Sequence, residues 1–547
     1  MKRADMQRFF ESTQTPEPFD LIIVGGGISG AAVAHEATAD GLRVALFEKD
    51  DFGWATSSAT SKLIHGGLRY LKTMEFGLVR ESLKERRILE DIAPNLVYPL
   101  PFVIPHYRRS EKWMLAAGLT LYDLLGFDRG WTRHKDKRIA RHRSLSVAEV
   151  RDLAPIIPEA GLVGGSLYYD CQSIFPERLT LAFLKSAAAG GAVLANRAPV
   201  IDFLNDGKRI SGVRVRDLLT GSEHEVRARL VVNTGGPWAD RLLSLARKDN
   251  DGPGRLRMSE GIHIIVPGLL KEHALVLLTP EGRHFFVLPW RGHSLIGTTD
   301  RPYEGNPDDY QVSRQSIEHF LREINASLST EPIDYKDIVF AYGGLRPLTD
   351  TQTESTYSSS RRYEIFDSAD QGLEGLLTVE GGKYTTSRNL AAKVLEQVAK
   401  KLGRKPTRSS SALLPLFGCD IDDLENFVSN LARTHPDLDA RTVRYLGRNY
   451  GSETHGVLDC AIGRPDLLKA KNDDGEILAQ VLYAVRSEMA SDLEDILLRR
   501  TGFGTLGCPP DSVLEEIAKT AGEELRWTDT DRKAQVRRAK EILAVPE

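Results

Sequence analysis

The sequence predicts an α/β protein that begins with a βαβ unit and ends in a helical region. Three observations predict this class. Residues 20–50 pass from an apolar strand through a glycine turn and an alanine-rich helix to a second apolar strand. Strand-like alternation dominates residues 259–300, which indicates a second, β-rich region. Residues 420–547 are charged, contain few β-branched runs and follow a helical pattern.

Length and composition describe a globular chain of more than one domain. Its 547 residues exceed one ordinary core, so two or three domains are expected. Hydrophobic residues make up 41% and charged residues 27%, which excludes a disordered or fibrous protein. The net charge of −4 gives no global electrostatic argument for nucleic-acid binding.

Targeting and metal signals are missing from the sequence. Neither HExxH nor GxSxG occurs, and no metal site is expected. Residues 1–18 form a polar arm without a signal-peptide core, and no apolar run reaches the roughly 18 residues of a membrane span. We therefore expect a protein on the cytosolic side of the membrane. The cysteines are too widely spaced for CxxC or zinc-type pairs and fit a reduced compartment: Cys171, Cys419, Cys460 and Cys508.

The first βαβ unit carries a GxGxxG fingerprint. Gly25 permits the tight turn after the strand, Gly27 lets the backbone approach a pyrophosphate, and Gly30 allows close packing of helix and strand. Glu48 ends the second strand, where an acid accepts hydrogen bonds from a ribose and disfavours a 2′-phosphate. Strand, fingerprint, helix and acid together predict a dinucleotide site, although a tight turn without ligand remains the alternative.

Two further glycine turns point to one large cofactor. Residues 229–239 form a strand that runs into a turn at Gly235. Residues 376–398 form a strand, a turn at Gly382 and a helix that opens near Thr385, whose free amides suit an anionic ring edge. Each turn taken singly is more often structural. The fingerprint alone leaves an NAD-linked dehydrogenase open beside a flavoprotein.

Four motifs together resemble the FAD-dependent, quinone-linked glycerol-3-phosphate dehydrogenases, which are related more distantly to D-amino-acid oxidases. They are GGGISG (25–30), TSSATSKLIHGGLRYL (56–71), GGLRPL (343–348) and EGGKYTTSR (380–388). The resemblance implies FAD and the oxidation of sn-glycerol 3-phosphate to dihydroxyacetone phosphate, in glycerol and glycerophospholipid catabolism. It also implies a Rossmann-like FAD-binding domain of the glutathione-reductase and D-amino-acid-oxidase type, with a β-rich substrate cap and a C-terminal helical domain.

The domain limits expected on this basis follow the motifs. The FAD-dependent region spans residues 19–405, between the N-terminal arm and a helical domain at 406–547. Within it, FAD-binding segments alternate with cap segments. The FAD-binding segments are about 19–98, 160–258 and 340–405, and the cap segments are about 99–159 and 259–339.

The resemblance also assigns roles to residues of the site. Arg346 and Arg361 are expected to clamp the substrate phosphate, because guanidinium groups bind it bidentately. For the base, His263 is proposed as an imidazole that titrates near neutral pH, and Lys383 is the rival. An isolated arginine is usually solvated, and a histidine between isoleucines is usually structural, so only motif position favours these roles. Further substrate contacts are expected from Arg69, Tyr70 and Asp300, and further FAD contacts from Ser57, Ser58, Lys62, Leu63, His65 and Gly66, as well as from Lys383.

The electron acceptor is the least defined partner. The resemblance implies a membrane quinone, whereas an oxidase would pass electrons to dioxygen, and a non-catalytic flavin-binding sensor is an alternative of another class. Residues 98–143 combine aromatic residues with a basic run, which suits either peripheral contact with the inner face of the membrane or a buried helix with a solvated loop. The sequence leaves open whether the protein forms a homodimer.

Overall fold

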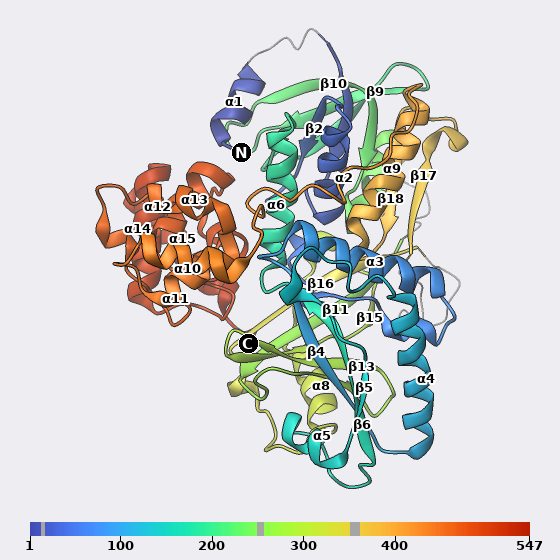
Figure 1. Ribbon diagram of the computed structural model, residues 1–547. Helices are drawn as coiled ribbons and strands as arrows, with labels where there is room; N and C mark the ends of the chain where they lie inside the picture. Colours follow the sequence, from blue (N-terminus) through green and yellow to red (C-terminus); the bar gives the residue numbers. More distant parts are fainter. Residues whose placement is uncertain (12–16, 249–255, 350–361) are drawn as a thin grey trace.

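The computed structural model describes residues 1–11, 17–248, 256–349 and 362–547. The chain builds two stacked sheet regions, with a helical unit beside them (Figure 1). This arrangement agrees with the predicted class of a Rossmann-like domain, a β-rich cap and C-terminal helices.

The first sheet has a parallel core in the order β18-β10-β1-β2-β7, with β17 antiparallel at one edge. Its central strand β1, Phe19–Val24, is almost wholly apolar because both faces are covered. β8 and β9 extend β10 as an antiparallel ribbon. The other strands are β2 Val44–Phe47, β7 Val193–Ala195, β8 Val200–Asn205, β9 Ile210–Arg216, β10 Glu223–Asn233, β17 Tyr363–Asp367 and β18 Leu376–Gly381.

Helices cover this sheet closely. α2, Ile28–Ala39, packs on α6, Pro176–Ala189, and on α9, Ser387–Lys401, and its alanines allow the close approach. α7 is Ala239–Arg247. The N-terminal segment forms a helix, α1 Arg3–Glu11, that buries Met6 and Phe10 in the core of the first sheet. Its two apolar side chains, one helical turn apart, explain why this part of the expected arm packs on the protein.

The second sheet runs in the order β15-β11-β14-β13-β12-β4-β6-β3, with β16 on β11 and β5 on β6. We call this sheet and its helices the cap. Three of its strands, β3, β6 and β16, lie wholly in ranges that the expected limits gave to FAD-binding segments, because alternation alone cannot tell which sheet a strand joins. The strands are β3 Leu63–Ile64, β4 Tyr98–His106, β5 Arg143–Leu145, β6 Gly164–Gln172, β11 Arg257–Pro267, β12 Ala274–Leu278, β13 His284–Trp290, β14 His293–Gly297, β15 Arg301–Tyr303 and β16 Phe340–Leu348.

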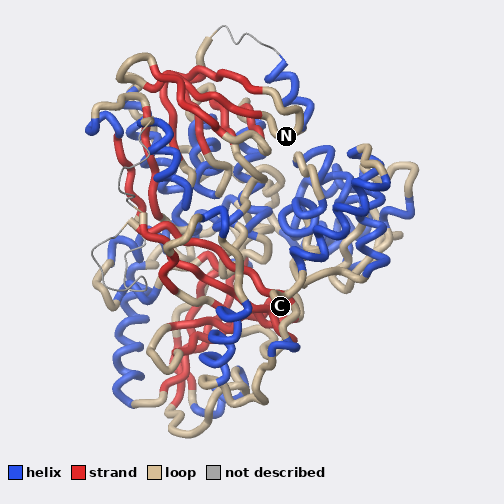
Figure 2. Tube along the Cα trace, turned by 180° about the vertical axis from the view of Figure 1, so that it is seen from behind, coloured by secondary structure: helices blue, strands red, loops and turns tan. Residues whose placement is uncertain are grey.

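Helices flank the cap sheet (Figure 2). α3, Phe76–Ile92, lies between the two sheet regions, and α4, Arg109–Leu125, runs along the outside of the cap (Figure 1). α5, Val147–Leu153, packs on β6, and α8, Arg314–Asn325, packs on β11. Within the described residues, no helix combines the length and the apolar composition needed to cross a membrane.

The C-terminal unit is helical, as its sequence pattern predicts. Arg499 and Arg500 fix it to the first sheet, since both pair with the fully buried Asp51 at 2.6 Å, three residues after the expected ribose ligand Glu48. Its helices are α10 Leu424–Thr434, α11 Ala440–Tyr450, α12 Thr454–Asp459, α13 Ala479–Glu488, α14 Asp511–Leu525 and α15 Asp529–Leu543.

Candidate active site

The glycine fingerprint forms a turn that tolerates no side chains. Gly25 has φ +108°, and a Cβ there would lie 2.7 Å from the carbonyl oxygen of Thr234. A Cβ on Gly30 would lie 1.9 Å from the carbonyl oxygen of Gly25, so helix α2 can approach β1 only with glycine at this position. The turn places the start of α2, with its amide donors, beside the cavity described below.

Ser57 caps the same helix. Its Oγ accepts a hydrogen bond from the Ile28 amide at 2.9 Å and would lie 3.0 Å from a Cβ on Gly27. Ser57 belongs to a short 3-10 helix, Ala55–Ser57, in a different segment from the fingerprint. A hydroxyl and helix amides therefore face the place where an anionic pyrophosphate would bind.

Glu48 follows β2 and lies against the fingerprint turn. Its Oε2 accepts a hydrogen bond from the Gly26 amide at 2.6 Å, and its Oε1 accepts one from Asp50 at 2.9 Å. Burial raises the pKa of this carboxyl to about 7, although the Gly26 amide lowers it. Glu48 lines the cavity, so its carboxyl has a ligand-facing position as well as a structural one.

One cavity of about 1440 Å³ joins the cradle to the cap. Ordinary small-molecule pockets hold about 300–1,000 Å³, so this volume suits a dinucleotide together with a second ligand. The predicted site residues that line it are Gly25, Gly27, Glu48, Ser57, Leu63, His65, Arg69, Tyr70, Gly235, His263, Asp300, Arg346, Gly382, Lys383 and Thr385.

Four predicted contacts lie behind this lining. Gly30 packs helix on strand, and the Ser58 hydroxyl donates to the Ala55 carbonyl at 3.0 Å. Lys62 Nζ lies 2.6 Å from Glu177 Oε1 in a buried ion pair, so this side chain is part of the protein interior and does not line the cavity. Gly66 is held in the cavity wall by a hydrogen bond from its amide to Asp170. The roles of all predicted residues toward a ligand remain predictions.

The IHGG segment is held against the cavity by contacts from distant elements. The His65 amide donates to Thr385 Oγ1 at 3.2 Å, and the Gly66 amide donates to Asp170 Oδ1 at 3.0 Å. A Cβ on Gly66 would lie 2.2 Å from the Tyr122 hydroxyl, so only glycine fits. Asp170 pairs in turn with the buried Arg86 at 2.6 Å. Sequence reasoning missed this anchor, because an Asp in β6 and an Arg in α3 carry no local motif.

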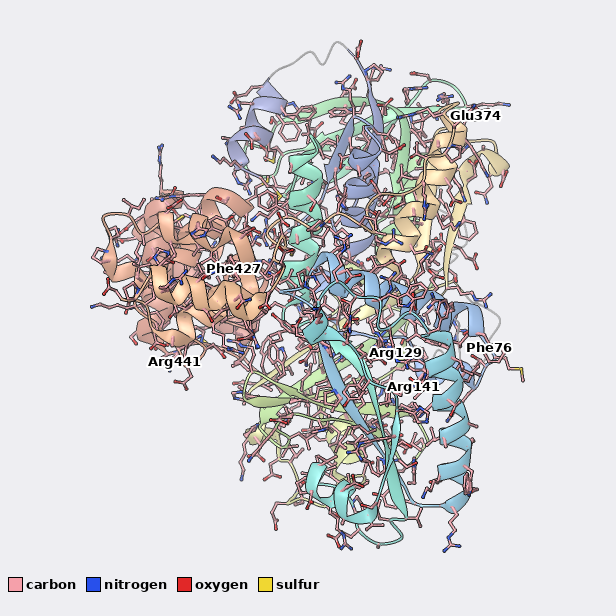
Figure 3. The ribbon with its side chains drawn as sticks, viewed as in Figure 1. Phe76, Arg129, Arg141, Glu374, Phe427 and Arg441 are labelled. Carbon is pink, nitrogen blue, oxygen red and sulfur yellow. The ribbon has the colours of Figure 1, made fainter. Side chains whose placement is uncertain are left out.

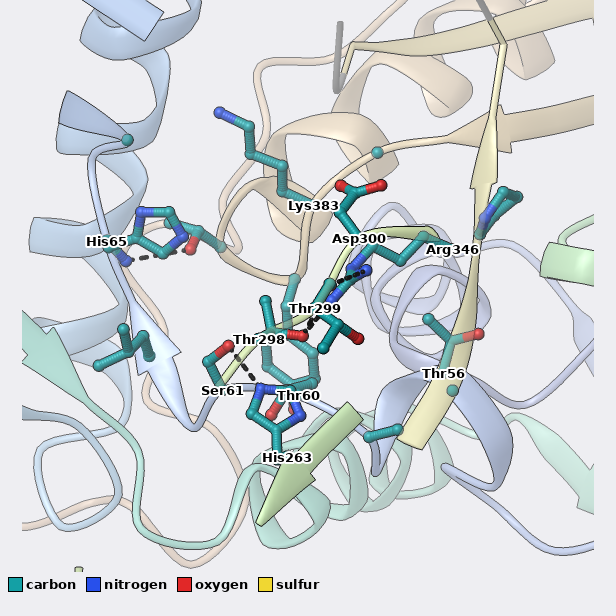
Figure 4. A pocket seen from close by; sticks show the side chains of 18 of the residues that line it. Thr56, Thr60, Ser61, His65, His263, Thr298, Thr299, Asp300, Arg346 and Lys383 are labelled. Atoms are coloured by element: carbon teal, nitrogen blue, oxygen red, sulfur yellow. Dashed lines mark hydrogen bonds between the residues drawn. The ribbon is translucent and has the colours of Figure 1, made fainter. Parts of the chain in front are cut away.

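His263 lies on β11 in the polar part of the cavity (Figure 4). Its Nε2 is 2.8 Å from Ser61 Oγ, and its ring stacks on Tyr342 with centroids 4.9 Å apart. Burial, and then the charges of Arg346 and Lys62, lower its pKa well below 6.5. The expectation of a histidine that titrates near neutral pH is therefore wrong for this structure, because the ring is desolvated beside two cations.

Arg346 is positioned by the ends of neighbouring strands (Figure 4). Its guanidinium donates to Thr298 Oγ1 at 2.6 Å and to the Thr299 carbonyl at 3.1 Å. It lies over Gly261, where a Cβ would come within 1.8 Å of Nη2. Asp300 accepts a hydrogen bond from Ser259 at 2.6 Å. Ser61 and Gly261 are functional candidates that the sequence did not single out.

The cationic groups of Lys383 and Arg69 both lie over the ring of Tyr70. The Lys383 ammonium lies 3.8 Å from the centroid of Tyr70 and 3.3 Å from Ser82 Oγ. The Arg69 guanidinium carbon lies 4.8 Å from the same centroid. In Figure 4 the Lys383 side chain extends away from Arg346, so the cavity has two separate cationic groups. Arg361, the second predicted phosphate ligand, lies outside the described residues.

Clusters of potential metal ligands are absent from the parts of the chain that the structure describes. No group of three or more His, Cys, Asp or Glu side chains there could hold a metal ion. The site consists instead of a glycine cradle, a helix N-terminus, two cationic groups and a buried histidine, all on one cavity.

Comparison with known proteins first gives the class. Residues 20–386 match the family model described as FAD dependent oxidoreductase, and residues 409–532 match the C-terminal domain of alpha-glycerophosphate oxidase. The glycine cradle and the large cavity fit the dinucleotide that this class uses. The fold and the site thus define a flavin-dependent oxidoreductase.

The particular family follows from close relatives. A glycerol-3-phosphate dehydrogenase of Synechocystis sp. is 33% identical, with 98% of each chain covered. A D-erythritol 1-phosphate dehydrogenase of Brucella abortus is 35% identical over 89% of this chain and 94% of its own. The X-ray structure of the Bacillus halodurans glycerol-3-phosphate dehydrogenase complexed with FAD superposes with a TM-score of 0.77 at 26% identity, covering 98% and 96%. The chain belongs to the FAD-dependent glycerol-3-phosphate dehydrogenase family.

Proposed function

We propose that the protein oxidises sn-glycerol 3-phosphate to dihydroxyacetone phosphate. The observation that carries the proposal is a single cavity in which a dinucleotide cradle meets cationic groups and a buried imidazole. Bound FAD would supply the acceptor for the hydride of the secondary alcohol. The protein then has to bind a phosphate dianion, hold the alcohol carbon in place and take up the hydroxyl proton.

The residues that would hold FAD lie at the cradle end and at the IHGG segment. Gly25, Gly27 and Ser57 would receive the pyrophosphate, and Glu48 the ribose. The short helix Tyr384–Thr386, which leads into α9, would direct its amides to the ring system.

The cationic groups would bind the substrate phosphate. Arg346 offers a planar fork that suits bidentate contact, and two of its contacts, with the Thr298 hydroxyl and the Thr299 carbonyl, are with neutral oxygens. Arg69 and Lys383 form the second cationic group, in which the Lys383 ammonium contacts the Tyr70 ring and the Ser82 hydroxyl.

His263 would take the hydroxyl proton. It is neutral at pH 7 because its pKa is lowered, and only the neutral ring can accept a proton. Among the described residues its Nδ1 has no hydrogen-bond partner, while Nε2 faces Ser61. A substrate phosphate would offset the charge of Arg346 and so raise the basicity of the ring during turnover. Lys383 is the alternative base.

Anaerobic titration tests the substrate. Glycerol 3-phosphate should bleach the flavin absorbance of the purified protein in one stoichiometric step. D-erythritol 1-phosphate is the informative competitor, because one relative bears its name. Faster bleaching by the four-carbon phosphate would replace the proposed substrate, and no bleaching by either would favour a non-catalytic flavin-binding sensor.

We propose a membrane quinone as electron acceptor, as the family resemblance implies. Reoxidation of the substrate-reduced protein by a soluble quinone should outpace reoxidation by air. Stoichiometric hydrogen peroxide formed at a comparable rate would instead assign the protein as an oxidase that uses dioxygen.

Peripheral contact with the inner face of the membrane fits the outer surface of α4. Trp113 is 74% exposed, Phe127 58% and Trp131 69%. Figure 3 labels Arg129, which binds the carbonyl of Asp123 at 3.1 Å near the end of α4. Further along, Arg133, Lys135, Arg138, Arg141 and Arg143 are exposed. Co-sedimentation with anionic liposomes should fall as salt rises, and salt-independent recovery in the supernatant would exclude this contact.

A further inference from the structure

The cap also contacts the first sheet region through Asp308, which binds Lys49, Trp238 and Arg241. A short 3-10 helix of the cap, Pro307–Asp309, presents Asp308 to that region. Asn306 fixes the turn, because its Oδ1 accepts the Asp308 amide at 2.8 Å. This contact borders the dinucleotide end of the cavity, since Asp308 lines the cavity and binds Lys49, the residue after Glu48.

One carboxylate takes three donors from two elements of the first sheet region. Lys49 Nζ lies 2.5 Å from Oδ1, and Trp238 Nε1 donates to the same oxygen at 2.8 Å. Arg241 donates to Oδ2 at 2.8 Å. Lys49 directly follows Glu48, and Trp238 follows the glycine turn at Gly235, so the donors come from the two segments that border the cradle. We call Lys49, Trp238, Arg241 and Asp308 the clasp.

Aromatic rings give the clasp a fixed shape. The Lys49 ammonium lies 3.9 Å from the ring centroid of Trp238 and 5.4 Å from that of Trp54. The two indoles are 5.4 Å apart. An exposed ion pair by itself contributes little, but a carboxylate with both oxygens engaged and a cation held over a ring keeps its geometry at lower entropic cost.

The position of the clasp gives it a consequence for the cofactor. All four of its residues and Trp54 line the cavity, so at this point the wall consists of cap on one side and first sheet region on the other. A dinucleotide bound in the cradle would lie behind that wall. A wall held by ion pairs has to open before a ligand that fills the space behind it can leave along this side.

We propose that Asp308 closes the cap over the adenosine end of the cradle and thereby retains FAD. The role is one of positioning, since Asp308 acts through Lys49, Trp238 and Arg241. The inference rests on FAD binding and not on the identity of the polyol phosphate or the electron acceptor. Its test therefore uses neither of them and stays separate from the test of the proposed function.

The rate at which the holoenzyme releases FAD tests whether the clasp retains the cofactor. Flavin fluorescence should recover after dilution about five- to twentyfold faster in Asp308→Ala than in wild type, as expected for the loss of a small charge network. Glu318→Ala is the matched control, because Arg314–Glu318 is an ion pair of the cap with similar exposure, 52% and 43% against 36% and 44% for Lys49–Asp308. It should release FAD at the wild-type rate.

Two further measurements keep the proposal testable if Asp308→Ala folds poorly. Lys49→Ala should also speed release, and the double variant should release FAD no faster than Asp308→Ala, because both changes break the same contact. Wild-type release should accelerate between about 0.05 and 0.5 M salt more steeply than release from Lys49→Ala. The proposal is overturned if Asp308→Ala releases FAD at the same rate as Glu318→Ala. It is also overturned if the double variant speeds release by the product of the two single effects, or if Lys49→Ala leaves the salt dependence of release unchanged.

Discussion

The cradle end of the cavity depends on backbone and on residues close in sequence, whereas its substrate end depends on side chains from distant strands. At the cradle, Gly25 and Gly30 create a turn in which the missing side chains are the essential feature. At the substrate end, His263 and Arg346 are placed by β11 and β16, which pair over nine residues although they lie some 80 positions apart in the chain. A backbone motif tolerates almost no change, while a constellation of side chains can lose one member and retain part of its activity.

The largest effect is expected at the cradle. Gly30→Val should abolish FAD binding, because a Cβ at this position would lie 1.9 Å from the Gly25 carbonyl oxygen and would push α2 away from β1. The flavin-to-protein absorbance ratio of the purified variant measures the loss. Gly77→Ala in α3 is the control, since a Cβ there meets nothing within 4 Å. A yellow Gly30→Val protein would contradict the account of the cradle.

A smaller loss is expected at the base. His263→Asn should slow anaerobic flavin reduction about 10²-fold or more, the lower end of general-base effects, while FAD stays bound. Stopped-flow absorbance measures the step. Ser61→Ala keeps the imidazole and removes only its Nε2 partner, so it should cost much less. A rate for His263→Asn within a few-fold of wild type would transfer the role to Lys383.

A still smaller effect is expected at the phosphate clamp. Arg346→Lys keeps the charge and loses the planar fork, so substrate binding should weaken by about tenfold, or 1.4 kcal/mol. The substrate concentration that half-saturates flavin reduction measures it. Binding at wild-type strength would mean that Arg69 and Lys383 hold the phosphate without Arg346.

The smallest effect is expected in the pH dependence of the unfolding free energy. The folded pKa of His263 lies well below the unfolded value near 6.5, so its contribution is complete above pH 6.5 and is lost as the pH falls below that value. Between pH 7.5 and 5.5 the wild type should lose about 1.4 kcal/mol more unfolding free energy than His263→Asn. Urea unfolding at both pH values gives the difference. Parallel losses in the two proteins would indicate that the folded ring takes up a proton as readily as the unfolded one, so that folding does not lower its pKa.

The helical C-terminal unit and the β-rich cap were predictable because periodicity is local. The limits of the cap were not, since β6 reads like any strand and only its nine-residue pairing with β4 assigns it to the second sheet. The packing of α1 was missed for the same reason, because Met6 and Phe10 are a weak apolar pattern until the core they meet is known.

The sequence by itself determined the glycine cradle and indicated a dinucleotide site, a candidate histidine and candidate arginines. It did so because a glycine turn between strand and helix is encoded within some thirty neighbouring residues. The tertiary structure alone decided how these groups behave: the lowered pKa of His263, the Asp170–Arg86 anchor behind Gly66 and the buried pairing of Lys62. Each depends on desolvation and on charges brought together from far along the chain, and neither quantity exists before the chain is folded.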